Sequence, residues 1–318
     1  MSRPLPGARP RGRSSRIAFA TWAKLPGLSD DDRLAVGPLA RLGLPVEGCV
    51  WDDPRVDWAE FDAIVVRSTW DYHRHLGEFL AWTDRAEVAP RLRNSPATIR
   101  WNSHKSYLLD LERGGVPIVP TRLVGDPEAV RAVARTEGWS TVVVKAAVSA
   151  GGFRTYRIDM RAAARGPVLG AVDPPEGELL VQPYREEVER SGERSLVFLG
   201  GEYSHAFLRA PRLAAGSPLV EGTRTDPSAS ELSVARAAIA AAPEPTVYAR
   251  VDLVRRDDGR TELMELELIE PALALGSSVG APERFAAAIA SAVGTTRPGG
   301  NQASWREEGR GRPEGASR

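Results

Sequence analysis

The feature that most constrains this chain is a short apolar hairpin near its C-terminal end that carries several carboxylates. Its two arms, residues 251–254 and 263–269, flank an Asp258-Gly259 pair, which is a strong signal for a tight turn between two strands. If this pair forms a two-residue loop, Asp257 pairs with Arg260, and the register of every other cross-strand pair follows from it. The hairpin therefore predicts which acidic side chains share a face.

In this register Asp252 lies opposite Glu265, and strand alternation puts Glu267 on the same face. Met264 and the neighbouring leucines point to the other face. Three carboxylates on one patch repel one another unless a cation or a proton cancels their charge. Oxygen ligands of this kind suit a hard divalent ion, above all Mg²⁺ with a phosphate substrate. The alternative interpretation is a solvated acidic strand face without a metal.

Composition excludes several classes of function. Lysine plus arginine (42) equals aspartate plus glutamate (42), so we expect no nucleic-acid or membrane partner. The single cysteine, Cys49, cannot form an internal disulfide and fits a cytoplasmic protein. Its apolar neighbours indicate a small buried residue rather than a nucleophile. Residues 1–15 and 295–318 have the composition of disordered tails.

The order of elements predicts an α/β protein with α+β subdomains between these tails. Residues 16–95 alternate strands and helices in the manner of a small Rossmann-like unit with a parallel sheet. Residues 96–180 and 181–294 are expected to form two further units. In parallel sheets, ligands bind beyond the carboxyl ends of the strands. The loop at 67–72 occupies that position in the first unit.

This loop supplies three substrate candidates, Arg67, Trp70 and Tyr72. An arginine suits a carboxylate, and aromatic rings suit the shape of a small polar acid or amino acid. Aromatic loop residues also pack domain interfaces, so that alternative stays open. Arg250 lies opposite Glu267 in the hairpin register, and a cross-strand ion pair is its leading explanation, with substrate binding as the other.

Lys145 follows an apolar strand and precedes Ser149-Ala150-Gly151-Gly152. Neither strand propensity nor burial explains a lysine there, and backbone N–H groups of a small-residue loop can cradle phosphates. An edge-strand lysine before a hairpin turn is an equal alternative. Residues 178–184 form a further apolar strand whose free backbone groups suit a purine edge. Arg209 is either an anion binder or a surface arginine.

Taken in order, these segments resemble the ATP-grasp superfamily over roughly residues 16–293. The motifs that carry the resemblance are Asn94-Ser95-Pro96, Lys105, Lys145 with its loop, Leu180-Val181-Gln182-Pro183-Tyr184, Gly192-Glu193, Arg209-Ala210-Pro211, Asp252 and Glu265-Leu266-Glu267. Residues 65–72 and 193–198 are most similar to the branch that contains bacterial glutathione synthetases and the cyclo-ligase that closes the D-cycloserine ring. Glu267 stands where many relatives have asparagine, which keeps an oxygen ligand.

The resemblance implies an ATP-grasp fold with an N-terminal pre-ATP-grasp domain and ATP between the last two units. The residues it assigns to ATP are Lys105, Lys145, Ser149, Gly151, Gly152, Gln182, Pro183, Tyr184 and Glu193, with Glu187 in reserve. Asp252, Glu265 and Glu267 are implied to hold two Mg²⁺ ions, or Mn²⁺. Arg209 and Lys145 are implied to be catalytic, with Arg209 on the transferred phosphoryl group.

The implied activity is an ATP-dependent carbon–nitrogen ligase in amino-acid or secondary-metabolite biosynthesis. A small substrate carboxylate attacks the γ-phosphate, and an amine then displaces phosphate from the acyl-phosphate. Two alternatives remain open, a kinase on a small alcohol and a non-catalytic nucleotide-binding relative. Retention of both lysines and all three acids argues against the second. A homodimer is compatible with the family resemblance.

Overall fold

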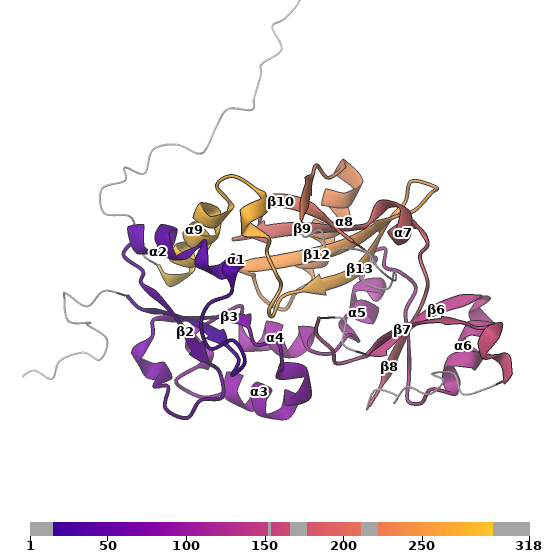
Figure 1. Cartoon of the computed structure of the whole chain (residues 1–318), viewed down its shortest axis with the longest axis horizontal. Coiled ribbons are helices and arrows are strands. Elements are labelled where there is room, and N and C mark those ends of the chain that lie inside the picture. The colour runs from indigo at the N-terminus through magenta and orange to yellow at the C-terminus, as the bar shows by residue number, and fades with distance from the viewer. Residues whose placement is uncertain (1–14, 152–153, 166–176, 211–221, 295–318) are drawn as a thin grey trace, which may run out of the picture.

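The computed structural model describes residues 15–151, 154–165, 177–210 and 222–294, and all statements below concern these residues. They form three sheets in separate parts of the molecule (Figure 1). The N-terminal sheet and the middle sheet lie at opposite ends, and the C-terminal sheet lies above and between them (Figure 1). The predicted tails fall outside the described residues, apart from residue 15.

The N-terminal sheet is parallel, with the strand order β2-β1-β3-β4, which confirms the predicted Rossmann-like unit. Its elements are β1 (Ile17–Thr21), α1 (Asp30–Arg33), α2 (Val36–Arg41), β2 (Val46–Val50), β3 (Ala63–Ser68), α3 (Leu76–Thr83) and β4 (Leu92–Arg93). Both β1 and β3 are buried along their whole length, because apolar side chains from helices cover both faces of the sheet.

The middle sheet is antiparallel, with the order β5-β8-β6-β7. The elements of this region are α4 (Pro96–Asn102), α5 (Tyr107–Arg113), β5 (Arg122–Val124), α6 (Ala129–Glu137), β6 (Thr141–Ala146), β7 (Thr155–Asp159) and β8 (Leu179–Pro183). Between α5 and β5, an isolated parallel β-bridge joins Ile118 to Leu263 of the C-terminal sheet. Because β8 pairs within this sheet, residues 181–183 lie with the middle strands; the division into units at 95/96 and 180/181 stays a prediction.

The C-terminal sheet is antiparallel, with the order β11-β10-β9-β12-β13. Its elements are α7 (Glu187–Ser191), β9 (Glu193–Leu199), β10 (Glu202–Arg209), β11 (Thr223–Thr225), α8 (Ala229–Ala240), β12 (Tyr248–Arg255), β13 (Thr261–Glu267) and α9 (Ala281–Val293). Gly200 and Gly201 have φ of 63° and 82°, as a type I′ turn between β9 and β10 requires. Short 3₁₀ turns are η1 (Trp58–Glu60), η2 (Tyr72–Arg74), η3 (Ala89–Arg91), η4 (Ala162–Arg165) and η5 (Leu275–Ser277).

The hairpin of β12 and β13 keeps the predicted acidic pairs but not the predicted loop. The backbone N–H of Arg256 donates to the carbonyl of Arg260 at 2.7 Å, so three residues, 257–259, form the loop. The prediction that Asp257 pairs with Arg260 is therefore wrong. Gly259, with φ of 85°, takes the left-handed position that such loops need.

A β-bulge restores the register beyond this loop. The pairing shifts between Asp252 and Leu253, which leaves Met264 as the extra residue of β13. Asp252 therefore lies opposite Glu265, and Arg250 lies opposite Glu267, as predicted. Met264 does not point away from the acids, because a bulge turns the extra side chain to the face of its neighbour, and both line one cavity.

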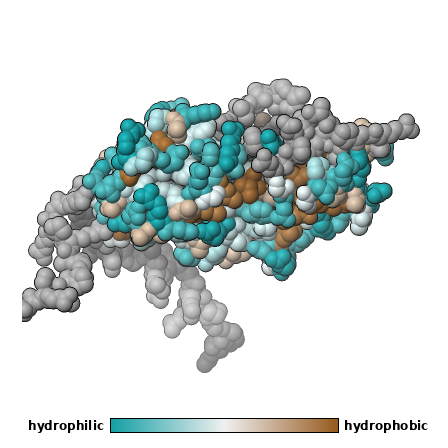
Figure 2. Space-filling model, turned by 90° about the horizontal axis from the view of Figure 1, so that it is seen from below, coloured by the Kyte–Doolittle hydropathy of each residue, from teal (hydrophilic) through white to brown (hydrophobic). Residues whose placement is uncertain are grey.

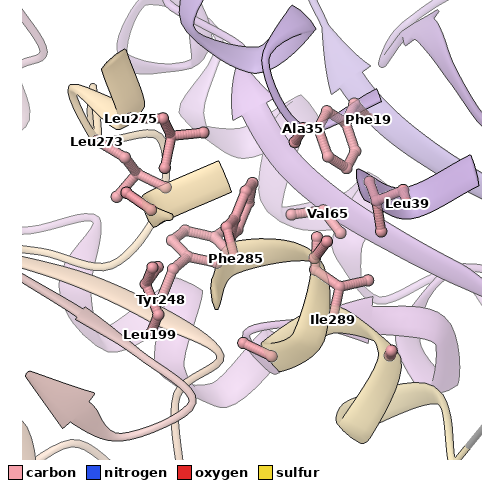
Figure 3. Close-up of a cluster of buried hydrophobic side chains, with 14 of the residues drawn as sticks. Phe19, Ala35, Leu39, Val65, Leu199, Tyr248, Leu273, Leu275, Phe285 and Ile289 are labelled. Atoms are coloured by element: carbon pink, nitrogen blue, oxygen red, sulfur yellow. The ribbon is translucent and has the colours of Figure 1, made fainter. Parts of the chain in front are cut away.

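A shared apolar core joins the N-terminal sheet to the C-terminal sheet (Figure 3). Phe285 of α9 lies between Phe19 and Tyr248, with ring centroids 6.0 Å and 6.1 Å away. Arg67 and Asp32 form an ion pair beside this core, with Nε 2.6 Å from Oδ1 and both side chains only 2% exposed. These contacts fix the first unit against the third.

The described surface is largely hydrophilic. In the view from below, hydrophobic residues gather in a band near the middle, between hydrophilic ends (Figure 2). Large hydrophobic side chains that are exposed among the described residues are Leu34, Trp70 and Val279. None of the described helices has the length and apolar character needed to cross a membrane.

We predict that Asp32→Asn destabilises the protein by about 3–5 kcal/mol, because it leaves the buried Arg67 guanidinium without its counter-ion. Urea denaturation followed by far-UV circular dichroism measures the effect. Asp30→Asn, in the same helix, is the matched control: its carboxylate is 97% exposed, so the midpoint stays unchanged. Equal midpoints for the two variants would contradict this role of Asp32.

A second prediction concerns Cys49, the one cysteine of the sequence. It lies buried in β2, and burial together with the nearby Glu47 raises the pKa of its thiol to about 11. The reactive thiolate is therefore about 100-fold scarcer at pH 8 than in a thiol of ordinary pKa. Iodoacetamide labelling at pH 8, followed by mass spectrometry, is therefore expected to be about 100-fold or more slower in native than in urea-unfolded protein. Comparable rates would show that the thiol is accessible.

Candidate active site

A cavity of about 610 Å³ opens where the three parts of the molecule meet. Its walls come from the middle sheet, the C-terminal sheet and the 3₁₀ turn that follows β3. Most predicted site residues line it, and they are Tyr72, Lys105, Lys145, Ser149, Gly151, Gln182, Pro183, Tyr184, Glu193, Arg209, Asp252, Glu265 and Glu267. Residues far apart in the sequence thus converge on one site.

The three acids of the hairpin form its centre. Asp252, Glu265 and Glu267 each offer a carboxylate oxygen, and these oxygens lie within 4.8 Å of one another. The set consists only of hard oxygen donors, which fits Mg²⁺. The solvated acidic face considered as an alternative does not describe them, because Asp252 is buried and all three line the cavity.

Two lysines balance the charge of Glu265. Lys105 Nζ donates to its carboxylate and to the carbonyl of Ser149, the latter at 3.3 Å. Lys145 Nζ lies 3.9 Å from the other carboxylate oxygen. Burial opposes ionisation of Glu265, but both ammonium groups hold its pKa well below the usual range. Burial lowers the pKa of Lys145, so a nearby phosphate would strengthen its charge.

Two arginines balance the other acids. Asp252 accepts from Arg250 Nε at 3.0 Å and from Arg209 Nη1 at 2.9 Å. Burial by itself would raise the pKa of Asp252, but the two guanidinium groups lower it. Arg250 also pairs with Glu267, whose pKa is nevertheless raised by burial and by its acidic neighbours. Glu267 is therefore the acid that a metal ion would relieve most.

One end of the cavity is built from the middle sheet and α7. Gln182, Pro183 and Tyr184 line it, together with Met264 of the bulge. The Arg157 guanidinium lies 4.0 Å from the Tyr184 ring centroid, and the Tyr184 hydroxyl donates to Glu189 at 2.5 Å. Backbone groups and apolar surface at this end suit a flat base, as the family resemblance implies.

Four predicted site residues lie elsewhere. Arg67 is buried against Asp32 and does not reach the cavity, because its pairing with the first helix turns it into the domain contact. Trp70 is 43% exposed and packs edge-on against Trp22. Arg250 lies behind the acids, where the predicted ion pair with Glu267 is confirmed. Glu187 lies 3.5 Å from Arg256, outside the cavity wall. Gly152 is outside the described residues.

Several residues of the wall were not predicted from the sequence. Asn102 donates to the carbonyl of Leu266 at 2.8 Å and accepts from the N–H of Leu268 at 2.9 Å, which holds β13 in place. Glu270 also lines the cavity; burial and the nearby Glu267 raise its pKa to about 8. The sequence offered one indication, since Glu270 follows closely after Glu265-Leu266-Glu267. Strand alternation could not predict the direction of its side chain, because β13 ends at Glu267.

Known proteins are similar to this chain in the N-terminal unit and over most of its length. Residues 17–94 match the family model of the N-terminal domain of D-cycloserine synthetase DcsG. The cycloserine biosynthesis protein DcsG of Streptomyces lavendulae is 35% identical over 268 residues, which cover 78% of this chain and 89% of that protein. This chain belongs to the DcsG family of ATP-grasp ligases. It is accordingly an ATP-dependent enzyme that joins a carboxylate to an amine, with ATP and Mg²⁺ as cofactors.

Solved structures of the ATP-grasp ligases agree with this fold. The crystal structure of D-cycloserine synthetase DcsG has a TM-score of 0.76 at 32% identity and covers 88% of this chain and 100% of that chain. A RimK-domain ATP-grasp protein of Sphaerobacter thermophilus has a TM-score of 0.62 at 21% identity, over 86% of this chain and 99% of that one. The second likeness concerns the fold alone.

Glu265→Gln is predicted to lower the rate of ADP formation by about three orders of magnitude or more. The reason is that a neutral amide replaces the ionised carboxylate that would hold a metal ion. A coupled assay for ADP measures it, and circular dichroism checks that the variant folds. Asp257→Asn, in the exposed loop of the same hairpin, is the control and keeps wild-type turnover. Near-wild-type activity in Glu265→Gln would contradict the metal assignment.

Proposed function

We propose that this DcsG-family ligase activates the carboxylate of a small amino-acid substrate as an acyl-phosphate and closes a ring by intramolecular attack of an amine. The observation that carries the proposal is the meeting of Asp252, Glu265 and Glu267 with three cations, Lys105, Lys145 and Arg209, on one cavity. The ring closure is supported by the likeness to a protein named as a D-cycloserine synthetase.

The acids would hold two Mg²⁺ ions, which supply charge neutralisation at the transferred phosphoryl group. The substrate carboxylate oxygen attacks the γ-phosphorus, and ADP leaves. The amine then attacks the acyl carbon, and inorganic phosphate leaves as the C–N bond forms. The protein supplies no covalent nucleophile in this scheme; its part is to position the reactants and balance their charge.

The cations would take the phosphates. Arg209 Nη1 lies 2.9 Å from Asp252 and 3.7 Å from Glu193, so its guanidinium is beside the acids, where the transferred group would lie. Lys105 and Lys145 stand on the other side, at Glu265. In the absence of nucleotide these side chains neutralise the acids; a phosphate chain with Mg²⁺ would exchange those partners without leaving a charge unpaired.

Residues 149–151 would cover the phosphates. The carbonyl of Ser149 accepts from Lys105 Nζ, which ties this segment to the phosphate-binding lysine, and Gly151 has φ of 61°, a conformation that glycine adopts without strain. A cover of this kind excludes water, which would otherwise hydrolyse the acyl-phosphate.

A cytoplasmic location is part of the proposal. The cytoplasm supplies ATP, and its reducing conditions keep the single thiol reduced.

Trapping with hydroxylamine tests the proposal. The protein is incubated with ATP, Mg²⁺, hydroxylamine and a panel of small amino acids, and ADP and hydroxamates are quantified. We expect ADP and hydroxamate in equal amounts with the true substrate, and omission of hydroxylamine gives the cyclic amide. ADP together with a stable phosphorylated alcohol, and no hydroxamate, would assign a kinase instead.

A further inference from the structure

One carboxylate of the cavity wall has no cationic partner among the described residues. The other four acids of the wall are paired: Glu265 with two lysines, Glu267 with Arg250, and Asp252 and Glu193 with Arg209. Glu270 lines the same cavity and is half-buried. In the described part of the chain no lysine, arginine or histidine forms an ion pair with it: the charge of Lys105 acts on it only from beyond ion-pair distance, and the hydrogen bond to its carboxylate comes from its own backbone N–H.

Glu270 is also separate from the proposed metal ligands. The carboxylate oxygens that lie within 4.8 Å of one another belong to Asp252, Glu265 and Glu267, and Glu270 is not part of this set. Its chain neighbour Ile269 packs with Tyr72 in the core of the N-terminal unit. Glu270 therefore lies beyond the acid cluster, on the side of the first unit.

This position is opposite to the nucleotide end. Gln182 and Tyr184 of the middle sheet form one end of the cavity, whereas Tyr72 of the first unit and Glu270 line another part of it. The acid cluster adjoins the part at Tyr72, because burial and then the charges of Glu270, Glu267 and Glu265 raise the pKa of the Tyr72 hydroxyl. A substrate whose carboxylate meets the γ-phosphate at the acids would extend from there toward Glu270 and Tyr72.

We propose that Glu270 binds the protonated α-amino group of the substrate, which is not the amine that closes the ring, and so selects amino acids over other small carboxylic acids. The inference rests on the proposed function, since that function places the substrate carboxylate at the acids. Burial and Glu267 raise the pKa of Glu270, so an approaching ammonium group favours the ionised form of this carboxyl and forms a charge-assisted hydrogen bond with it. The fold has already neutralised the other four acids, so Glu270 is the place where a cationic group of the substrate is favoured.

Binding, rather than turnover, tests this assignment. Isothermal titration calorimetry is done with Mg²⁺ and the non-hydrolysable ATP analogue AMP-PNP bound, using matched pairs of ligands: D- and L-alanine against D- and L-lactate, and D- and L-serine against D- and L-glycerate. Wild-type protein is expected to bind at least one amino acid about 10-fold or more tightly than its hydroxy acid. In Glu270→Gln this preference falls to within about twofold, while AMP-PNP affinity stays unchanged.

Two further variants complete the design. Glu270→Asp keeps the charge and is expected to retain part of the preference, which separates loss of charge from loss of structure. Glu283→Gln removes an exposed carboxylate of α9 that pairs with Arg41 of α2, and this variant is expected to keep wild-type selectivity.

A wild-type protein without preference for any amino acid overturns the assignment. So does a Glu270→Gln variant that loses affinity for AMP-PNP and Mg²⁺ as strongly as for amino acids, since that result would make Glu270 a metal ligand. An amino-acid preference that depends on Glu270, combined with no hydroxamate in the trapping assay, would uphold this inference while the proposed ligase reaction fails.

Discussion

Charge balance around three neighbouring carboxylates is the constraint on which the rest of the structure depends. Unpaired, such acids would cost several kcal/mol each on leaving water. The cations that balance them come from separate segments: Lys105 precedes α5, Lys145 lies on β6, Arg209 ends β10 and Arg250 lies on β12. The acid cluster is therefore stable only when the middle sheet and the C-terminal sheet stand together, and the cavity between them is the result.

The same arrangement makes the site ready for a nucleotide. Glu265 and Asp252 are already paired with the cations proposed to take the phosphates, and Glu267 is paired with Arg250. In the proposed function, arrival of nucleotide and metal would exchange partners of opposite charge on both sides, so no intermediate with a bare buried charge would be needed. Glu270 forms no such pair, and this exception gives the cavity a direction, from Tyr184 of the middle part toward the first unit at Tyr72.

The sequence predicted the fold class and most of the cavity wall, for physical reasons that can be named. Two apolar arms around Asp258-Gly259 indicated the hairpin, and the order of several motifs indicated residues that the structure brings together on one cavity. Arg67 could not be placed in this way, because its partner Asp32 lies 35 residues earlier in the chain and no local pattern links them. Glu270 was missed because the strand ends at Glu267, so alternation says nothing about the side chain three residues on.

The hairpin also shows how a correct pairing can follow from an incorrect loop. The three-residue loop shifts the register by one residue, and the bulge at Met264 shifts it back. The number of residues between Asp252 and Glu265 is thus what determines whether the acids face one another, since one residue more or less would turn Glu265 into the apolar core. The chemical identity of the loop residues is accordingly of little consequence for this pairing, whereas insertion or deletion of a single residue in this segment would separate the three acids.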